Sequence, residues 1–277
     1  MCRWLAYLGP PIFMDTLLTK PKHSLIDQSL HAQLNYIPGV GNWTTNGDGF
    51  GIGWYGERPR PGRYRDIRPA WNDENLRCLA EQIRSPLFVA HVRAATGGGI
   101  QRTNSHPFLH ENWLFQHNGE IPEFQKIKRE LQFEVAPELF PYILGSTDSE
   151  TCFYLALTYG LAEDAPLALQ RMAARVERAR SEAGLEKPFR LTCAATDGQK
   201  IYALRYSSDC HSKTLFHNRN VEAVRQLEGD YEGFPPDGLI IVSEPLDELK
   251  ENWVEMPEST LLIAEAGRIT TQPFEPG

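Results

Sequence analysis

The sequence predicts a layered α+β fold, and three observations lead to this expectation. Runs of apolar and β-branched residues typical of strands occur early and late in the chain. Segments with helical spacing lie between them. No internal repeat, low-complexity tract or long linker divides the 277 residues, a length that one large domain can accommodate. We therefore expect a single domain over residues 1–277.

The first third of the chain alternates between the two patterns. Leu76, Leu79 and Ile83 share one face of a predicted helix, and the apolar run that follows reads as a buried strand. The segment around Gly51 and Gly53 is a glycine-rich strand, in which glycines indicate close backbone approach. The expected strands are 3–8, 50–55 and 87–91, and the expected helices are 14–19, 25–32 and 72–83.

The middle of the chain is predicted to be helical and its last third to be antiparallel sheet. Thr147 and Glu150 form a capping-box pattern that opens a long apolar helix. An Asp197-Gly198 turn joins two strands of the last third. The expected helices are 122–131, 148–161 and 165–183, and the expected strands are 113–116, 190–195, 200–206, 239–242, 260–264 and 268–272.

Charge and composition exclude several classes of function. With 28 basic and 36 acidic residues the net charge is −8, so no nucleic-acid partner is expected. The one basic run is broken by proline, glycine and aspartate, and is predicted to be a solvated loop or strand face; it contains Arg58, Arg60, Arg63, Arg65 and Arg68. No apolar segment approaches the roughly 18 residues of a membrane span. We expect no membrane partner, no export signal and a cytoplasmic location.

The cysteines and histidines give no metal or cofactor pattern. Five cysteines, without a C-x-x-C pair, suggest neither a disulfide framework nor a zinc site. His106 and His110 are four residues apart, but Pro107 argues against a helix that would aim both at one metal, so both are predicted to be loop histidines. His91 and His117 are predicted to be hydrogen-bonded structural histidines.

The sequence also gives no supported nucleotide-binding motif. Residues 51–56 satisfy G-x-G-x-x-G, but prolines follow where the dinucleotide fingerprint requires a helix. Phosphate-loop and serine-hydrolase motifs are missing from the sequence. We expect no cofactor and no metal.

Cys2 is the candidate nucleophile. It follows Met1, and methionine aminopeptidase readily removes a methionine before so small a residue, which would give Cys2 a free α-amine. A free amine titrates at about 7.7–8.0 and a thiol at about 8.5, so the two can exchange a proton near neutral pH. The alternative is an ordinary buried or frayed cysteine.

Other residues could complete a site for an amino-acid amide. Asn118 and Gly119, expected just after a strand, offer two uncharged donors for an oxyanion, or form a simple Asn-Gly turn. Arg93 could bind a carboxylate with its planar fork, or form a structural ion pair. Asp148, in the first turn of its helix, could bind an ammonium group or simply stabilise the helix dipole. Together they suit an α-amino acid whose side-chain amide faces Cys2.

The same residues resemble the class II glutamine amidotransferases, an N-terminal-nucleophile family. The resemblance is dense over residues 1 to about 160. It rests on motifs that occur in the family's order: Met1-Cys2-Arg3, Asn46-Gly47-Asp48-Gly49-Phe50-Gly51, His91-Val92-Arg93-Ala94-Ala95-Thr96, Asn104-Ser105-His106-Pro107, His117-Asn118-Gly119 and Ser146-Thr147-Asp148-Ser149-Glu150.

The resemblance implies a four-layer αββα sandwich of two antiparallel sheets, of the Ntn-hydrolase type. It implies Cys2 as nucleophile, with its freed α-amine as base, and an oxyanion hole formed by Asn118 and Gly119. The implied substrate-binding residues are Arg93 and Thr96 for the α-carboxylate, Asp148 for the α-amine, and Asp48, Gly49 and Phe50 for the pocket wall.

Two departures indicate the stand-alone branch of the family. Thr45-Asn46-Gly47 stands where synthase-fused members have His-Arg-Gly, and the chain ends without room for a synthase domain. That branch includes γ-glutamyl amidohydrolases of the ergothioneine pathway and of glutathione degradation. The implied activity is hydrolysis of the γ-amide of glutamine or of a small γ-glutamyl compound through a thioester on Cys2.

Alternatives stay open at this stage. A separate synthase or other amine acceptor could be a partner. The chain could instead be a Cys-initiated hydrolase of other acyl amides, which would not need the amino-acid clamp. It could also be a regulatory or binding domain in which Cys2 is idle.

Overall fold

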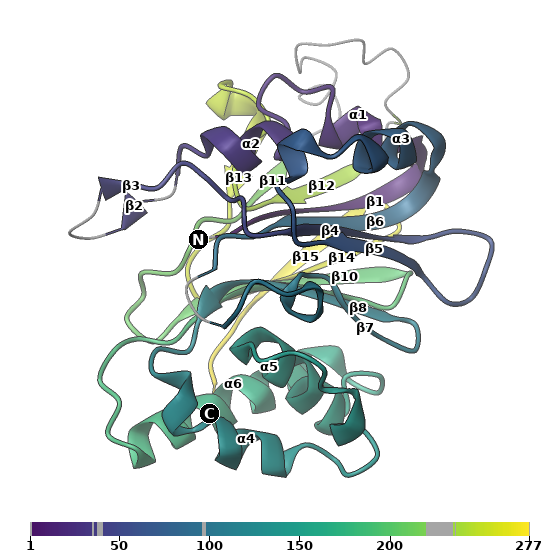
Figure 1. The fold of residues 1–277 in the computed structure, drawn as a ribbon. Helices are drawn as coiled ribbons and strands as arrows, with labels where there is room; N and C mark the ends of the chain where they lie inside the picture. Colours follow the sequence, from purple (N-terminus) through teal and green to yellow (C-terminus); the bar gives the residue numbers. More distant parts are fainter. Residues whose placement is uncertain are drawn as a thin grey trace.

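Two antiparallel sheets lie face to face with helices outside both, which gives four layers (Figure 1). The computed structural model describes residues 2–34, 36–37, 41–95, 98–219, 235 and 237–276. The predicted αββα sandwich is confirmed. No helix within those ranges is long and apolar enough to cross a membrane.

The first sheet has seven strands among the described residues and holds the N-terminal strand at its centre. Trp4 pairs with His91 on one side of this strand, and Leu5 pairs with Val242 on the other. The strand order is β13 (Trp253–Glu255), β11 (Phe216–Asn218), β12 (Leu239–Val242), β1 (Arg3–Phe13), β6 (Arg84–Val92), β4 (Phe50–Tyr55) and β5 (Gly62–Asp66).

The second sheet has six strands in the described part of the chain. Its order is β15 (Arg268–Pro273), β14 (Thr260–Glu265), β10 (Lys200–Ser207), β9 (Arg190–Thr196), β8 (Trp113–Glu120) and β7 (Phe108–His110). A small separate ribbon joins β2 (Tyr36–Ile37) and β3 (Gly41–Asn42).

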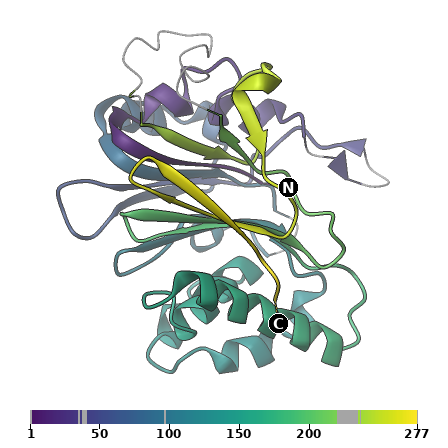
Figure 2. The same cartoon turned by 180° about the vertical axis from the view of Figure 1, so that it is seen from behind.

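Helices cover the outer face of each sheet (Figures 1 and 2). The first sheet carries α1 (Asp15–Leu18), α2 (Leu25–His31) and α3 (Glu74–Gln82). The second carries α4 (Lys128–Glu134), α5 (Asp148–Thr158) and α6 (Ala165–Glu182). Short 3-10 turns are η1 (Ala70–Asn72), η2 (Arg102–Asn104), η3 (Phe124–Lys126), η4 (Phe140–Tyr142) and η5 (Lys250–Asn252).

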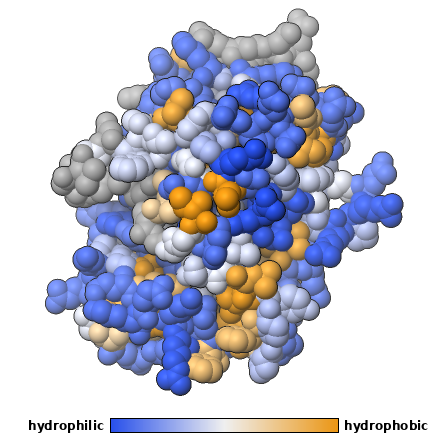
Figure 3. All heavy atoms as spheres, viewed as in Figure 1, coloured by the Kyte–Doolittle hydropathy of each residue, from blue (hydrophilic) through white to orange (hydrophobic). Residues whose placement is uncertain are grey.

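Three apolar clusters hold the four layers together. One lies between the first sheet and its helices, one between the two sheets, and one between the second sheet and its helices. β1 serves two of them, because Trp4 packs between the sheets and Leu5 packs toward the helices. Each buried large apolar side chain contributes about 1.5–3 kcal/mol. On the face drawn in Figure 3, apolar side chains are scattered among hydrophilic ones.

Most predicted elements are present, with three differences. The strand predicted at 113–116 continues to Glu120, so Asn118 and Gly119 lie within β8 rather than after it. The helix predicted at 122–131 is split into η3 and α4. β7, β11 and β13 were not predicted, because strands of three residues carry almost no periodicity. Part of the basic run forms the edge strand β5, which agrees with the loop or strand face predicted for it.

Candidate active site

Cys2 lies just before β1, and its half-buried side chain lines a small, partly open space between the sheets. Its Sγ is 3.7 Å from the carbonyl oxygen of Ala94. The space has a volume of about 20 Å³, enough for one water-sized group. It is lined by Cys2, Ala94, Asn118, Gly119, Glu120, Arg190 and Lys213.

Strand alternation explains why the Cys2 thiol faces this space. Trp4 packs between the sheets, and its indole Nε1 donates to the carbonyl of Thr192 on β9 at 3.3 Å. Side chains two residues apart along an extended chain point the same way, so Cys2 is directed toward the second sheet as well. Arg3 points oppositely, toward the helices.

The side chain of Arg3 holds the backbone of Cys2. Arg3 is fully buried, and its Nη1 donates to the carbonyl of Cys2 at 2.9 Å while its Nε donates to Glu244 at 2.6 Å. Ser243 fixes the next residue, because the Trp4 amide donates to its hydroxyl at 2.9 Å and its own amide donates to the Trp4 carbonyl at 3.0 Å. The position of Cys2 is therefore set by the residues that follow β12.

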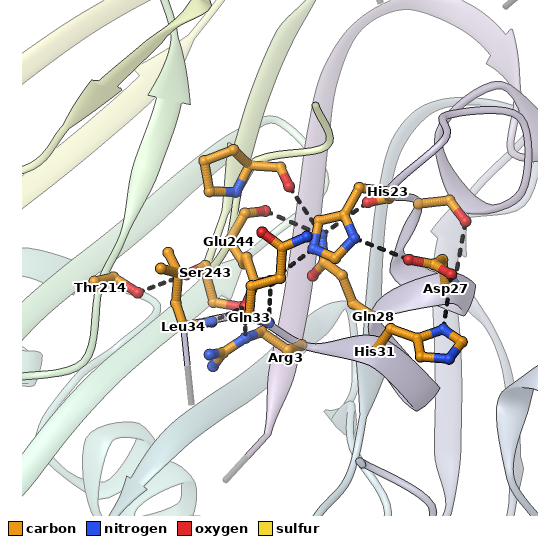
Figure 4. Close-up of polar contacts among 12 residues, drawn as sticks. Arg3, His23, Asp27, Gln28, His31, Gln33, Leu34, Thr214, Ser243 and Glu244 are labelled. Carbon is orange, nitrogen blue, oxygen red and sulfur yellow. Dashed lines mark hydrogen bonds and ion pairs between the residues drawn. The ribbon is translucent and has the colours of Figure 1, made fainter. Parts of the chain in front are cut away.

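Glu244 is the centre of this buried network (Figure 4). Besides Arg3, it accepts hydrogen bonds from the backbone N–H groups of Gln33 at 2.7 Å and Leu34 at 3.0 Å, and it contacts the His23 ring at 2.6 Å. Burial alone would raise the pKa of Glu244. The His23 hydrogen bond, the Arg3 charge and the two N–H groups outweigh burial and lower this pKa to about 2.

Asn118 brings an unused donor to the Cys2 space. Its neighbour Gln116 donates to the Leu5 carbonyl across the sandwich at 3.0 Å, so this face of β8 points at the first sheet. The Asn118 side chain is 1% exposed, and its Nδ2 has no hydrogen-bond partner within the part of the chain that the structure describes. An unmet buried donor costs about 1–3 kcal/mol, so this amide has a donor available for a ligand oxygen.

His117 alternates to the opposite face of β8. Its Nδ1 is 2.8 Å from the Ser149 hydroxyl on α5, and its Nε2 is 3.1 Å from the Arg190 carbonyl on β9. Burial lowers the pKa of His117, which favours the neutral ring. Both ring nitrogens are occupied, as expected of a structural histidine, and this packing fixes the strand that carries Asn118.

Gly119 sits where a side chain does not fit. A Cβ at this position would collide with the Arg190 carbonyl and with the His117 ring. We expect Gly119→Ala to lower the free energy of unfolding by about 1–3 kcal/mol, because the backbone of β9 must move. Urea denaturation measures this loss. Gly56→Ala is the control, since a Cβ there meets nothing within 4 Å and should change stability by less than about 0.5 kcal/mol; equal losses would contradict the prediction.

Arg93, Asp48 and Gly49 form a joined group beside Ala94. Arg93 is 3% exposed, and its Nη1 lies 3.4 Å from the carbonyls of Asp48 and Gly99. The Asp48 carboxylate accepts from the Ala95 amide at 2.8 Å. Gly49 has φ +116°, and a Cβ there would lie 2.7 Å from the Ser105 hydroxyl, so glycine is required.

Asp148 begins α5 and also binds the end of β8. One carboxylate oxygen accepts from the Ile121 amide at 2.7 Å, and the other accepts from the Ser149 amide at 2.7 Å. Thr147 caps the helix by accepting from the Glu150 amide at 3.2 Å, as the capping-box pattern predicted. The Glu150 carboxylate, however, accepts from Leu144 and Gly145 rather than closing the box.

The Phe50 side chain is 1% exposed and packs in the core between the first sheet and its helices, so only its backbone is available to the pocket wall. Thr96 lies outside the described residues.

Four residues that line the Cys2 space were not predicted: Ala94, Glu120, Arg190 and Lys213. Ala94 and Glu120 adjoin the predicted Arg93 and Gly119, so widening those motifs by one residue would have found them. Arg190 faces Glu120 across the β8–β9 pair, and Lys213 arrives from an irregular segment. Neither has a local signal in the sequence.

The histidines give no metal centre among the described residues, where no group of three or more His, Cys, Asp or Glu could hold an ion. His106 is not an ordinary loop histidine, since it is 3% exposed and stacks on His91 with ring centroids 4.1 Å apart. His110 belongs to strand β7. The burial of His106 could not be predicted from the neighbouring sequence, because His91, on which it stacks, lies in strand β6.

An αββα sandwich with a cysteine at the start of a central strand defines an N-terminal-nucleophile type of enzyme. The chain belongs to the class-II glutamine amidotransferase family, whose family model matches residues 17–276. The match begins after Cys2, and the structure brings the Cys2 thiol into the same small space as Asn118 and Gly119.

Individual relatives agree with this membership. The chain is 34% identical to "Probable glutamine amidotransferase DUG3" of Saccharomyces cerevisiae, covering 99% of this chain and 84% of the relative. It is 26% identical to the γ-glutamyl-hercynylcysteine sulfoxide hydrolase of Mycolicibacterium smegmatis, covering 99% and 100%. A solved class-II glutamine aminotransferase domain protein from Silicibacter pomeroyi is 33% identical, with TM-score 0.73 and coverage of 99% and 100%.

Proposed function

We propose that this chain hydrolyses the γ-amide bond of glutamine or of a γ-glutamyl compound, and that one domain over residues 1–277 carries the activity. The family and the names of the two relatives support this reaction class. The observation that carries the proposal is the buried, unpartnered Asn118 amide in the same small space as the Cys2 thiol.

The reaction begins at Cys2 once Met1 has been removed. The thiol sulfur attacks the γ-carbonyl carbon, and the thiol proton passes to the α-amine of Cys2. The carbonyl oxygen becomes an oxyanion that accepts from Asn118 Nδ2 and the Gly119 N–H. One such donor is worth roughly 2.7–4 kcal/mol in the transition state.

The intermediate then loses its amine and is hydrolysed. The C–N bond breaks, the leaving nitrogen takes the proton held by the Cys2 amine, and a γ-glutamyl thioester remains. Water gives a proton to the same amine and attacks the thioester carbon. Collapse of the second oxyanion breaks the C–S bond, returns the proton to sulfur and releases glutamate.

The α-amino acid end of the substrate is assigned to the clamp. Arg93 and Thr96 bind the α-carboxylate, Asp148 binds the α-ammonium, and Asp48, Gly49 and the Phe50 backbone form the wall. Support comes from the hydrogen bonds that join Arg93, Asp48 and Ala95 beside the Cys2–Ala94 contact. Asp148 accepts one N–H on each oxygen and retains further lone pairs for an ammonium group.

The remaining assignments follow from this chemistry. The acyl-transfer steps use only side chains, a backbone N–H and water, so neither a cofactor nor a metal is assigned. The ligand is a small molecule, and a separate amine acceptor is an optional partner of the reaction. We place the protein in the cytoplasm, where its five cysteines remain reduced.

The test is labelling with the glutamine-like electrophile 6-diazo-5-oxo-norleucine. We expect one adduct, on the peptide that begins with Cys2 and lacks Met1, and we expect activity to fall in step with labelling. Intact mass and peptide mapping measure both. Burial raises the pKa of the Cys152 and Cys193 thiols and keeps them unreactive.

Cys78 and Cys210 supply matched controls, because both are exposed free cysteines. Cys78→Ser and Cys210→Ser should retain the adduct and the activity, whereas Cys2→Ser should lose both. Labelling confined to Cys78 or Cys210, with Cys2 free of adduct, would refute the proposed function.

A further inference from the structure

Lys213 is a cation of the Cys2 space that the proposed mechanism does not use. It lines that space together with Cys2, Asn118 and Gly119. Its backbone is fixed from two sides, because its carbonyl accepts from the Thr192 hydroxyl on β9 at 3.2 Å and the next residue, Thr214, donates to the Ser243 carbonyl at 2.8 Å. Thr214 and Ser243 are drawn in Figure 4. Lys213 is thus held where the two sheets meet beside the nucleophile.

The two cations that line this space, Arg190 and Lys213, differ in their carboxylate partners. Arg190 faces two carboxylates, with Glu120 at 3.8 Å and Asp209 at 3.4 Å. The Lys213 ammonium has no ion pair or hydrogen bond to its Nζ among the described residues. Its half-buried position and the charge of Arg190 lower the pKa of Lys213 to about 8, so it remains mostly protonated at neutral pH.

The oxyanion and the α-carboxylate of the substrate already have proposed binding groups. An anion bound by Lys213 must therefore be a third one. The oxyanion is held by the uncharged donors of Asn118 and Gly119, and the α-carboxylate is assigned to Arg93. The Lys213 carbonyl accepts from Thr192, which pairs with Asn118 across the β8–β9 ladder, so Lys213 lies next to the strand segment that carries Asn118 and Gly119. An anion bound there belongs to the part of the substrate beyond the scissile amide.

We propose that Lys213 binds a carboxylate carried by the leaving amine, so that the preferred substrates are γ-glutamyl amino acids or peptides rather than glutamine. The proposal rests on the proposed function, since it presumes that the scissile γ-carbonyl is bound next to Cys2. A charged hydrogen bond in a partly desolvated site has the strength to set such a preference.

A matched pair of substrates isolates the carboxylate. γ-Glutamylglycine and γ-glutamyl ethylamide differ only in whether the leaving amine ends in a carboxylate or a methyl group. The wild-type protein is expected to favour γ-glutamylglycine in kcat/KM by at least roughly tenfold. Lys213→Gln should lower kcat/KM for γ-glutamylglycine by roughly 10- to 100-fold, mainly through KM, and change ethylamide turnover by less than about twofold.

Two further variants control for charge and folding. Lys213→Arg keeps a cation and should restore most of the preference for γ-glutamylglycine. Lys200→Gln removes an exposed lysine at the far end of β10, paired with Glu265, and should leave both substrates unaffected. Thermal unfolding of every variant should match the wild type, because backbone groups rather than the Lys213 ammonium hold the segment.

Equal loss on both substrates in Lys213→Gln would overturn the proposal, and so would equal rates for both substrates in every variant. If Cys2 is labelled by 6-diazo-5-oxo-norleucine but the wild-type protein shows no preference, only the role of Lys213 fails. If Cys2 takes no label and neither substrate is hydrolysed, the proposed function fails with it.

Discussion

Asn118→Leu is expected to lower kcat by roughly 10²- to 10³-fold and to leave KM nearly unchanged, because the lost donor acts on the oxyanion and not on the bound substrate. The free energy of unfolding should fall by less than about 1 kcal/mol, since Asn118 Nδ2 gives up no hydrogen bond in the free protein. Steady-state kinetics and urea denaturation on the same preparation measure both quantities.

Gln116→Leu is the matched control on the same face of β8. Its amide donates to the Leu5 carbonyl at 3.0 Å, so its removal loses one buried hydrogen bond and should cost about 0.5–1.5 kcal/mol of stability. Its kcat should remain within about twofold of wild type. The two variants therefore have opposite profiles, and a stable, fully active Asn118→Leu would exclude the oxyanion role.

Glu244→Gln is expected to produce the largest loss of stability, about 3–5 kcal/mol at pH 7, because it leaves the buried Arg3 charge without its partner. Activity should fall as well, since the Arg3 guanidinium also holds the Cys2 carbonyl. Glu265→Gln, at an exposed ion pair with Lys200, is the control and should cost less than about 1 kcal/mol. Similar losses in the two variants would contradict this account.

The Glu244 carboxylate also determines how the free energy of unfolding falls at low pH. The pKa of Glu244 is about 2 in the folded protein and is near its ordinary value of about 4.3 when unfolded. A lowered pKa contributes stability that is complete above the unfolded value and is lost as pH falls toward 2. The loss should reach about 3 kcal/mol, and Glu244→Gln should lack it.

The contribution of His23 to the free energy of unfolding is lost as pH rises, which is opposite to that of Glu244. Burial would lower the pKa of His23, but the hydrogen bonds and charges of Glu244 and Asp27 raise it above its ordinary value. Its contribution is therefore complete below about pH 6.5 and declines as pH rises through the folded pKa. The network is fully formed between about pH 4.5 and 6.5.

Local features of the chain were readable from the sequence. The Thr147 cap, the glycine-rich strand Phe50–Tyr55 and the helical spacing of residues 72–83 are features of short, contiguous segments, so their elements were predicted closely. The end of β8 was not, because residues 117–120 extend the strand only through pairing with Arg190–Cys193. A segment without its partner strand carries no such information.

Long-range contacts explain what the sequence did not reveal about the site. Glu244 approaches Arg3 only because Leu5 pairs with Val242, and Lys213 approaches Cys2 only because Thr192 and Ser243 hold its segment. The motif resemblance placed the segment around Phe50 at the pocket wall, and only the folded strand shows that the Phe50 side chain packs in the core. Strand register, which joins residues 2, 118 and 213, is a property of the folded sheets.

The position of Cys2 immediately before β1 also limits how the site can open. β1 is hydrogen-bonded on both sides, by β12 and β6, and the following residues are buried. Strands of this kind open only when most of the protein unfolds. The nucleophile thus has no hinge of its own. The sulfur is therefore a fixed reference point, and a bound substrate must align its carbonyl with it.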